Sequence, residues 1–355
     1  MDTEVRSGVK KSRLNRHMSG IWLVLLPAMV LLMFMLGWGL GLFTEIEEEP
    51  YISETSNQIV VGVSQLGSES GWRTANTESI QRAISKENGF FLIYNNARQK
   101  QENQIKAIRN FISQRVDYIV LAPVVESGWE TVLQEAKQAG IPVILMDRSV
   151  EVEDQSLYTA LVGTDSVEEG RKAGRWLEEY LIKKRMSDRD INIVVLKGTE
   201  GASAQIGRTA GFSMIAGEHD NWHILEQQYG DFTIYKGKEV MKDLLKKYKD
   251  IDVVVSQNDD MTFGAIEAIR ESGKTVGVNG DITIISFDAV HDALEMVAEG
   301  VINVDIECNP DQGEYVSEVI RLLESGQEVE KRYYVEEDVF TMDNVTQEVL
   351  NGRTY

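Results

Sequence analysis

Residues 117–148, "DYIVLAPVVESGWETVLQEAKQAGIPVILMDR", hold the pattern that decides the fold. Two apolar runs, 117–123 and 141–147, flank a stretch near 127–139 that is predicted to be helical. The apolar runs are continuous rather than alternating, which is typical of strands buried on both faces of a parallel sheet. The stretch therefore predicts a strand, a helix and a second strand parallel to the first.

The same alternation continues in both directions along the chain. Apolar runs at 59–65 and 90–94 come before the quoted stretch, and each is followed by a predicted helix. After it the cycle restarts, with apolar runs at 158–165, 191–198, 222–228, 251–257, 282–288 and 301–307. Two series of similar size predict an α/β protein of two lobes, each a parallel sheet with helices on both faces.

The amino-acid composition of the chain excludes several classes of function. The chain has 355 residues, which suits two domains, and a formal net charge of −21. The acidity argues against a nucleic-acid partner, because phosphate binding needs clustered Lys and Arg. The single cysteine, Cys308, excludes a disulfide within the chain and is interpreted as a small buried residue. With only four histidines besides, we expect no metal site, and we expect no cofactor.

The amino end carries the signal of a membrane segment. Residues 1–20 hold five basic residues against two acidic residues, and 21–43 contain no charged residue. About 20 apolar residues span a bilayer core, and a basic flank stays inside. We therefore expect a basic cytoplasmic tail (1–20), a single-pass transmembrane anchor in the cell membrane (21–43) and an acidic linker (44–57), with the folded part on the extracytoplasmic side. The alternative, a cleaved signal peptide, has a shorter apolar region and an A-x-A-like cleavage site.

Polar and aromatic side chains stand where the predicted strands end or where the predicted helices begin. In open α/β sheets, ligands bind outside the carboxyl ends of the strands. This rule gives a set of candidate ligand-binding residues, which consists of Trp72, Arg73, Asp147, Arg148, Arg208, Phe232, Asn258, Asp288 and Asn309.

The side-chain types in this set suit a small polyol. Asp accepts hydrogen bonds and Arg offers a rigid fork of donors, so together with Asn they can grip neighbouring hydroxyl groups. Aromatic rings cover the apolar C–H faces of such a ligand. For an acid after a strand the alternative is a helix N-cap, which we favour for Asp165, Asp231 and Asp259. For Trp72 the alternative is core packing.

Residues 57 to about 335 resemble the bacterial periplasmic sugar-binding proteins of the ribose and galactofuranose type, which are the solute receptors of ABC importers. The resemblance is nearer to the galactofuranose type and does not extend to the predicted anchor. The segments that carry it are "VGVSQLGSESGWR", "RQKQENQIKAIRNFISQRVDYIVLAPVVESGWE", "AKQAGIPVILMDRSV", "GASAQIGRTAGF", "GDFTIYKGKEVM" and "SQNDDMTFGAIEAI".

The resemblance implies two lobes that close on a sugar by a hinge motion. It places the N-terminal lobe at 58–163 and 309–333, and the C-terminal lobe at 164–308 and 334–355. It also implies that the nine candidates named above contact the sugar. One departure from the resemblance is Ala289, because relatives of this branch tend to have glycine at this position.

The function implied by the resemblance is a tethered receptor that captures a monosaccharide (galactofuranose-like, pentose or hexose) and delivers it to an ABC permease. The alternative is a sensor accessory that signals to a membrane histidine kinase or chemoreceptor. An enzyme is disfavoured, because the glycines at 62, 67 and 71 do not fit the G-x-G-x-x-G dinucleotide pattern. The candidate acids also alternate with Arg and Asn, which suits holding a ligand rather than cleaving it.

Overall fold

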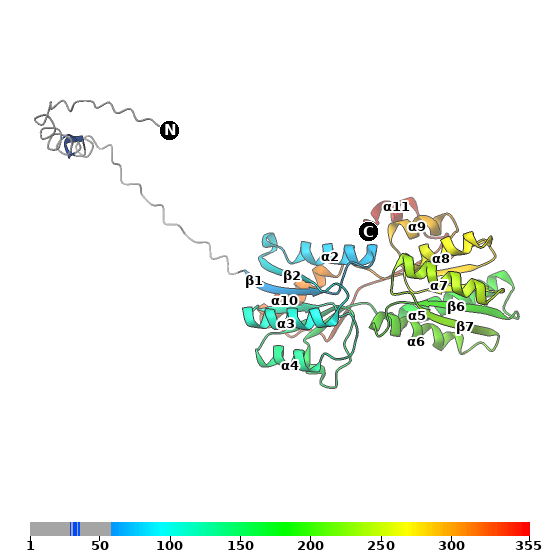
Figure 1. The fold of residues 1–355 in the computed structure, drawn as a ribbon, viewed down its shortest axis with the longest axis horizontal. Coiled ribbons are helices and arrows are strands. Elements are labelled where there is room, and N and C mark those ends of the chain that lie inside the picture. The colour runs from blue at the N-terminus through cyan, green and yellow to red at the C-terminus, as the bar shows by residue number, and fades with distance from the viewer. Residues whose placement is uncertain (1–28, 30, 34, 36–57) are drawn as a thin grey trace, which may run out of the picture. The chain divides into compact units, whose positions relative to one another are not determined.

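The computed structural model describes residues 29, 31–33, 35 and 58–355 (Figure 1). Residues 58–355 belong to one compact unit, Ser56–Tyr355, and the description below concerns them. Among the described residues, no helix has the length and apolar character needed to cross a bilayer. The predicted tail (1–20) and linker (44–57) lie outside the described residues, as does nearly all of the predicted anchor (21–43).

The first sheet has six strands, and all of its pairings are parallel. Three of its four inner strands consist only of buried residues, because helices cover both faces. Across the sheet the order is β11 (Arg332–Tyr334), β5 (Ala160–Gly163), β4 (Val143–Asp147), β3 (Tyr118–Leu121), β1 (Ile59–Gln65) and β2 (Phe90–Asn96).

The second sheet also has six strands, and one of them differs from the expected parallel arrangement. The edge strand β12 pairs antiparallel with β10, because the chain enters this sheet from the first lobe in the opposite direction. The other pairings are parallel. The order is β12 (Val339–Phe340), β10 (Val304–Glu307), β9 (Thr283–Asp288), β8 (Val253–Ser256), β6 (Ile191–Lys197) and β7 (Trp222–Tyr229).

Helices cover both faces of the first sheet (Figure 1). One face packs against two helices that lie far apart in the sequence, and the other face packs against two consecutive helices. In that order they are α2 (Gly71–Ala83) and α10 (Gly313–Glu324), then α3 (Gln101–Gln114) and α4 (Glu130–Gln138). Ile80 of α2 and Ile320 of α10 are buried in the same hydrophobic cluster. A helix that follows the second lobe in sequence therefore completes the core of the first.

The second sheet is covered in the same way. Two helices pack on one face, three pack on the other, and a short helix follows near the carboxyl end. They are α5 (Ser166–Lys184) and α6 (Ser203–Ala216), then α7 (Ile234–Lys247), α8 (Asp259–Glu271) and α9 (His291–Ala298), and finally α11 (Gln347–Gly352). The two-lobed α/β fold predicted from the alternating pattern is confirmed.

The sequence of α5 shows why a helix begins and ends where it does. The Asp165 side chain caps the start by accepting from the backbone N–H of Glu168, and Lys183 and Lys184 occupy the last turn. Acidic residues near the amino end and basic residues near the carboxyl end stabilise a helix, because their charges interact favourably with the helix dipole. The helix ends at Arg185, which adopts a left-handed conformation. This helix places Glu169, in its first turn, next to the region between the lobes.

Three segments of the chain pass between the two sheets. They connect β5 to α5, β10 to α10, and β11 to β12. Away from these segments the lobes also touch through hydrogen bonds that backbone N–H groups donate. Glu126 N donates to Gly201 O at 2.9 Å, and Ser149 N donates to the Ser203 hydroxyl at 2.9 Å. The structure therefore represents an arrangement in which the lobes are in contact.

Candidate functional site

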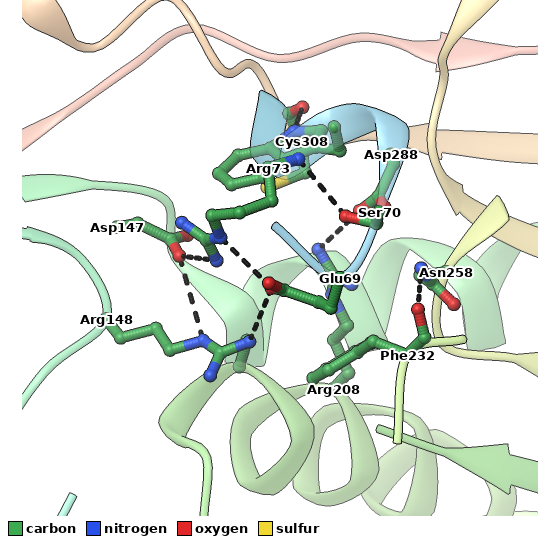
Figure 2. Close-up of a pocket in the computed structure, with 12 residues that line it drawn as sticks. Glu69, Ser70, Arg73, Asp147, Arg148, Arg208, Phe232, Asn258, Asp288 and Cys308 are labelled. Atoms are coloured by element: carbon green, nitrogen blue, oxygen red, sulfur yellow. Dashed lines mark hydrogen bonds and ion pairs between the residues drawn. The ribbon is translucent and has the colours of Figure 1, made fainter. Parts of the chain in front are cut away.

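A small cavity of about 20 Å³ lies between the lobes, at the carboxyl ends of strands from both sheets. This space holds about one water molecule, so a sugar can enter only when the lobes move apart. Figure 2 shows its lining residues, which are Glu69, Ser70, Trp72, Arg73, Asp147, Arg148, Ala204, Arg208, Phe232, Asn258, Asp288 and Cys308. Eight of the nine residues predicted from the sequence are in this set, and Asn309 is not.

Arg73 lies at the centre of a charge network on the first-lobe side (Figure 2). Its Nη2 donates to Asp147 Oδ2 at 2.5 Å and its Nε donates to Glu69 Oε1 at 3.1 Å. Its Nη1 approaches the amide oxygens of Gln65 and Asn76 at 3.5 and 3.3 Å. Burial alone would lower the pKa of Arg73, but Asp147 and Glu69 outweigh burial and hold the pKa above its ordinary value. The guanidinium therefore stays charged.

Arg148 is buried beside this network and has weaker partners. Its Nη1 donates to Val124 O at 3.1 Å, whereas its Nε lies 3.7 Å from Asp147 Oδ2 and its Nη2 lies 3.9 Å from Glu69 Oε1. Nε has no hydrogen-bond partner among the described residues. Burial and the nearby Arg73 lower the pKa of Arg148 to about 10, which leaves it charged at neutral pH. A buried donor without a partner is costly, so this Nε would gain from an acceptor in the cavity.

Three cavity residues have backbone conformations that side-chain-bearing residues rarely adopt. The φ angles are +66° for Asp147, +58° for Phe232 and +111° for Asp288. Each such conformation costs on the order of 1–3 kcal/mol, and they gather at functional sites. Gly163 makes the turn at Asp147 possible, because a Cβ added to this glycine would lie 2.9 Å from the Asp147 carbonyl oxygen.

Arg208 forms the corresponding network on the second-lobe side. Its Nε donates to Glu169 Oε2 at 2.7 Å, its Nη2 donates to Asp288 Oδ1 at 3.3 Å, and its Nη1 donates to the Gln257 carbonyl. Burial alone would lower the pKa of Arg208, but Glu169 and Asp288 hold it well above its ordinary value. Burial raises the pKa of Asp288, and Arg208 opposes this rise. The Asp288 carboxyl group would therefore be stabilised in its charged form by further donors, such as ligand hydroxyl groups.

Asn258 and Phe232 are held in place by each other and by a glycine. Asn258 Oδ1 caps α8 by accepting from Met261 N at 3.0 Å, and its Nδ2 donates to Phe232 O at 3.3 Å. The Phe232 ring lies below the guanidinium of Arg148, with 5.2 Å between the Arg148 Cζ and the ring centroid. A Cβ on Gly198 would fall 1.8 Å from Phe232 Cζ, so the ring fits only because position 198 is glycine.

Trp72 connects the lobes rather than packing in the first-lobe core. Its Nε1 donates to the Cys308 carbonyl at 2.5 Å, and its ring belongs to a hydrophobic cluster built mainly from second-lobe residues. The neighbouring Gly71 N donates to Asp260 Oδ2 at 3.3 Å, which is a second contact between the lobes. Burial raises the pKa of Asp260 to about 6, and the hydrogen bond from Gly71 opposes this rise.

The residues that line the cavity differ in two ways from those predicted from the sequence. Asn309 lies next to Cys308, but its side-chain oxygen accepts from Asp311 N at 2.9 Å, so it is engaged in its own turn and its ligand contact stays a prediction. Sequence reasoning did not single out Glu69 or Ser70, although both precede Trp72 in a segment that carried the resemblance, and it did not single out Ala204. Cys308 is buried, as expected, and it also lines the cavity.

The N-cap interpretation holds for one of three aspartates. Asp165 caps α5, as predicted. For Asp231 it is wrong, because the cap of α7 is Thr233. For Asp259 it is also wrong, because Asn258 caps α8 and the Asp259 carboxylate turns inward to Ser286. Sequence distance explains the last case, since Ser286 lies on β9, 27 residues after Asp259.

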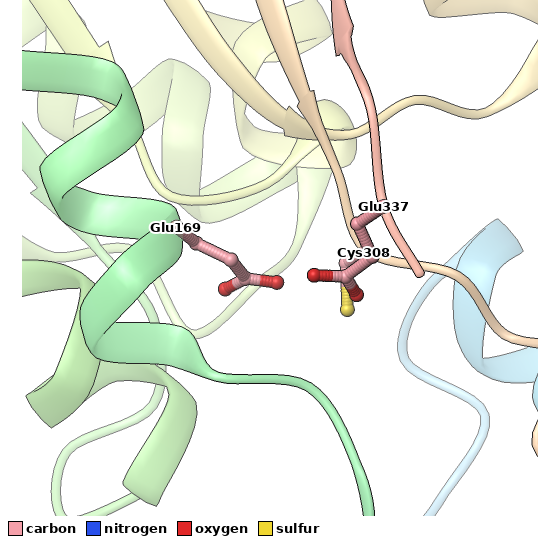
Figure 3. A group of neighbouring side chains, drawn as sticks. All are labelled: Glu169, Cys308 and Glu337. Carbon is pink, nitrogen blue, oxygen red and sulfur yellow. The ribbon is translucent and has the colours of Figure 1, made fainter. Parts of the chain in front are cut away.

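One group of side chains behind the cavity has the spacing of metal ligands. Glu169, Cys308 and Glu337 bring one ligand atom each within 4.8 Å of one another (Figure 3). The Glu169 carboxylate is paired with Arg208 at 2.7 Å, so its charge is already balanced. Burial and the nearby Glu169 raise the pKa of Glu337 to about 9, which keeps that carboxyl group protonated at neutral pH. A protonated acid and a paired carboxylate are poor ligands for a cation.

A family model for a periplasmic binding protein domain matches residues 61–328, well over half of the chain. This chain belongs to the periplasmic binding protein family. The resemblance stated from the sequence segments is thereby confirmed. One relative is the galactofuranose-binding protein YtfQ of Escherichia coli (strain K12), which is 45% identical over 255 residues. The match covers 71% of this chain and 78% of YtfQ.

Two solved structures share the fold with this chain. A protein from Mycobacterium smegmatis in complex with β-D-fucofuranose is 43% identical with a TM-score of 0.79, over 84% of this chain and 95% of that one. The periplasmic binding protein component of the arabinose ABC transporter from Shewanella sp. ANA-3, bound to α- and β-L-arabinofuranose, is 42% identical with a TM-score of 0.77. That match covers 83% of this chain and 95% of the other.

Proposed function

We propose that this periplasmic binding protein captures a monosaccharide in its five-membered furanose form between its lobes and delivers it to an ABC importer. The observation that carries the proposal is the lining of the cavity, which includes three guanidinium groups, three carboxyl groups and two aromatic rings. The furanose ligands of the two solved relatives support the ring form. The protein binds its sugar unchanged and acts as no enzyme.

We assign roles to the lining residues from the hydrogen-bond donors, acceptors and ring faces that they can offer to a ligand. The Arg148 Nε is a buried donor that has no partner in the described part of the chain, and it suits a ring or hydroxyl oxygen. Asp147 and Asp288 suit hydroxyl donors on opposite sides of the ligand, since each belongs to a different lobe. The rings of Trp72 and Phe232 suit the apolar C–H faces of a sugar.

Closure of the two lobes on the sugar is part of the proposal. We assign 58–163 and 309–333 to the N-terminal lobe, and 164–308 and 334–355 to the C-terminal lobe. Charged and polar groups that face an open cleft would be hydrated, and closing on a sugar exchanges that water for ligand hydroxyl groups. Ligand binding therefore favours the closed arrangement to the extent that the sugar contacts both lobes.

The sugar and its ring form are tested by one experiment on the full-length protein in mild detergent. Thermal unfolding is measured with galactose, arabinose, fucose, ribose and fructose, because a ligand that binds only the folded state raises the melting temperature. Any sugar that raises it is then supplied with ¹³C at the anomeric carbon, and the bound signal is recorded by NMR. A furanose shift supports the proposal. A pyranose shift contradicts the ring form, and no rise with any sugar contradicts the receptor.

We further propose that residues 21–43 stay attached and tether the receptor to the cell membrane, with 58–355 on the extracytoplasmic side. The uncharged run at 21–43 and its basic flank support this. The test is detergent extraction of membranes from the native host, followed by intact-mass measurement. A mass that includes 1–43 supports the tether, and a mass that lacks about the first 45 residues contradicts it.

A further inference from the structure

Two buried carboxyl groups lie behind the cavity and have no place in the proposed sugar contacts. Asp259 is the first residue of α8 and Asp305 lies in the middle of β10, and both side chains are fully buried. The consecutive backbone N–H groups of Ala289 and Val290 donate to Asp305 at 3.2 Å and to Asp259 at 2.9 Å, so the two carboxyl groups lie side by side. Two carboxylates in such contact cannot both be ionised at low cost, so one of them must hold a proton.

The hydrogen bonds identify Asp259 as the ionised member. Its Oδ1 accepts from the Ser286 hydroxyl at 2.5 Å, and its Oδ2 accepts from Val290 N at 2.9 Å. Both oxygens therefore act as acceptors, which suits a carboxylate. Asp259 also lies in the first turn of α8, and Val290 is the N-cap residue of α9, so two helix amino ends favour negative charge there.

The same reasoning identifies Asp305 as the protonated member. Its Oδ1 accepts from Ala289 N at 3.2 Å, whereas its Oδ2 has no donor among the described residues. A proton on Oδ2 would be donated to Asp259 and would satisfy both groups. Asp288 and Arg353 are the other charged groups that act on Asp305, and Asp288 is in turn faced by Arg208, Glu169 and Asp260.

The pair holds the turn that carries a cavity residue. Asp288 and Ala289 are consecutive residues with φ of +111° and +59°, which is an unfavourable conformation for two residues with side chains. The two backbone N–H groups that follow Asp288 each donate to one member of the pair. Asp288 itself lines the cavity and lies 3.3 Å from Arg208 Nη2. The direction of the Asp288 side chain therefore depends on the pair.

We propose that Asp259 and Asp305 share one proton and act as positioning residues that hold Asp288 toward the ligand. This inference rests on the proposed sugar-binding function for its effect on affinity. It makes the two aspartates chemically unequal although they are neighbours. Only Asp305 can be replaced by an amide, because an amide offers one acceptor and one donor group, as a protonated carboxyl group does.

The test compares Asp305→Asn with Asp259→Asn and Asp305→Leu in the full-length protein. Binding of L-arabinose and D-galactose is measured by calorimetry. We expect Asp305→Asn to bind within about threefold of wild type, because its oxygen still accepts from Ala289 and its amide donates to Asp259. We expect the other two variants to bind at least about tenfold more weakly, since each leaves a buried donor or acceptor unpaired. Asp292→Asn, on the exposed surface of α9, is the matched control and should bind as wild type does.

A pH profile separates positioning from a merely structural role. Burial raises the pKa of both groups, that of Asp305 to about 7, and the two titrate as one unit. In wild type, the shared proton is lost as the pH rises through the raised pKa of the pair, the carboxylates then repel each other and sugar affinity falls. In Asp305→Asn no proton is lost there, so affinity should be nearly constant from about pH 6 to pH 9.

Unfolding at several pH values tests the shared proton without any sugar. A group that binds a proton more tightly in the folded protein than in the unfolded chain makes the free energy of unfolding fall as the pH rises, here from about 4 to 7. Asp305→Asn removes this titrating group and should therefore reduce the slope. An unchanged slope overturns the shared proton, and so does weak sugar binding by a folded Asp305→Asn. If wild type binds neither of these sugars nor any of the others screened above, the proposed function fails, and the unfolding profile still decides on the pair.

Discussion

At the scale of single residues, the first-lobe side of the cavity depends on one buried cation and the acids around it. Arg73 reaches both Asp147 and Glu69, and Arg148 relies on the same two acids at longer distances. Removal of one buried acid therefore affects two guanidinium groups at once. A buried charge that loses its partner costs more than the original interaction gained.

Asp147→Asn should weaken sugar binding by at least about 2 kcal/mol, or roughly thirtyfold in Kd. The amide keeps the shape of the side chain but removes the charge that faces Arg73 and Arg148. Calorimetric titration measures the change. Asp154→Asn is the control, since Asp154 pairs with Lys137 on the exposed surface and exposed pairs contribute little. Binding by Asp147→Asn close to that of the control would remove Asp147 from the site.

Trp72→Phe should weaken sugar binding about fivefold while the free energy of unfolding changes little. Phenylalanine keeps a ring between the lobes but loses the hydrogen bond from Nε1 to Cys308 O, and a neutral hydrogen bond contributes about 1 kcal/mol. The matched variant is Trp129→Phe, whose Nε1 donates to Val125 O at 2.7 Å within the first lobe. That variant should lower stability and leave affinity nearly unchanged, and the reverse pattern would contradict the assigned role of Trp72.

The sequence predicted site residues that end apolar strands and missed those that depend on distant partners. Asp147 and Arg148 stand out because a buried strand leads directly into them. Glu69 is placed by an irregular loop, and Glu169 becomes significant only because the fold brings it to Arg208, 39 residues later. A local sequence pattern does not predict which distant residues will form such pairs.

At the scale of elements, strand prediction succeeded where both faces are buried. The strands β3, β4 and β8 are short runs of buried residues, and their hydrophobicity marks them directly. The edge strands β11 and β12 were missed. β11 is the partly exposed segment Arg332–Tyr334, and β12 has only two residues. Neither therefore has the continuous apolar run that predicts a buried strand.

Gly198→Ala should reduce sugar affinity at least about tenfold, because the added methyl group cannot occupy the same space as the Phe232 ring. Overpacking of this kind also costs about 1–3 kcal/mol of stability. Gly352→Ala is the matched control, since nothing lies within 4 Å of its added Cβ. Binding is measured by titration and stability by urea unfolding. Wild-type affinity in Gly198→Ala would show that the position of the Phe232 ring does not matter.

At the scale of the whole molecule, buried and exposed acids respond to pH in opposite directions. Burial raises the pKa of Asp260 to about 6 and that of Glu337 to about 9. Hydrogen bonds from Ser156 and from Lys238 lower the pKa of the exposed Asp154 and Glu271 to about 2. A raised folded-state pKa gives stability that is lost as the pH rises, and a lowered one gives stability that is lost as the pH falls.

The free energy of unfolding should therefore be greatest in mildly acidic solution, near pH 5. It should fall gradually toward pH 9, as the buried acids lose protons that the unfolded chain has already lost above about pH 4. Below about pH 4 the free energy of unfolding should fall again, as the exposed acids with a lowered pKa become protonated. This fall should be small, because solvent screens the exposed ion pairs. Urea unfolding at intervals from pH 3 to pH 9 measures the curve. A maximum at pH 8 or above would contradict the assigned burial effects.

The interleaved path of the chain bears on how the protein is made. As residues 58–163 leave the ribosome, they lack both α10, which covers the Ile80 face, and β11, which pairs with β5. Residues 164–331 must be synthesised first, which takes on the order of ten seconds or more at roughly 5–20 residues per second. During that interval an apolar sheet face and an unpaired strand edge are open to solvent. The nascent first lobe therefore keeps exposed the kind of apolar surface and strand edge that chaperones bind, until synthesis passes Tyr334.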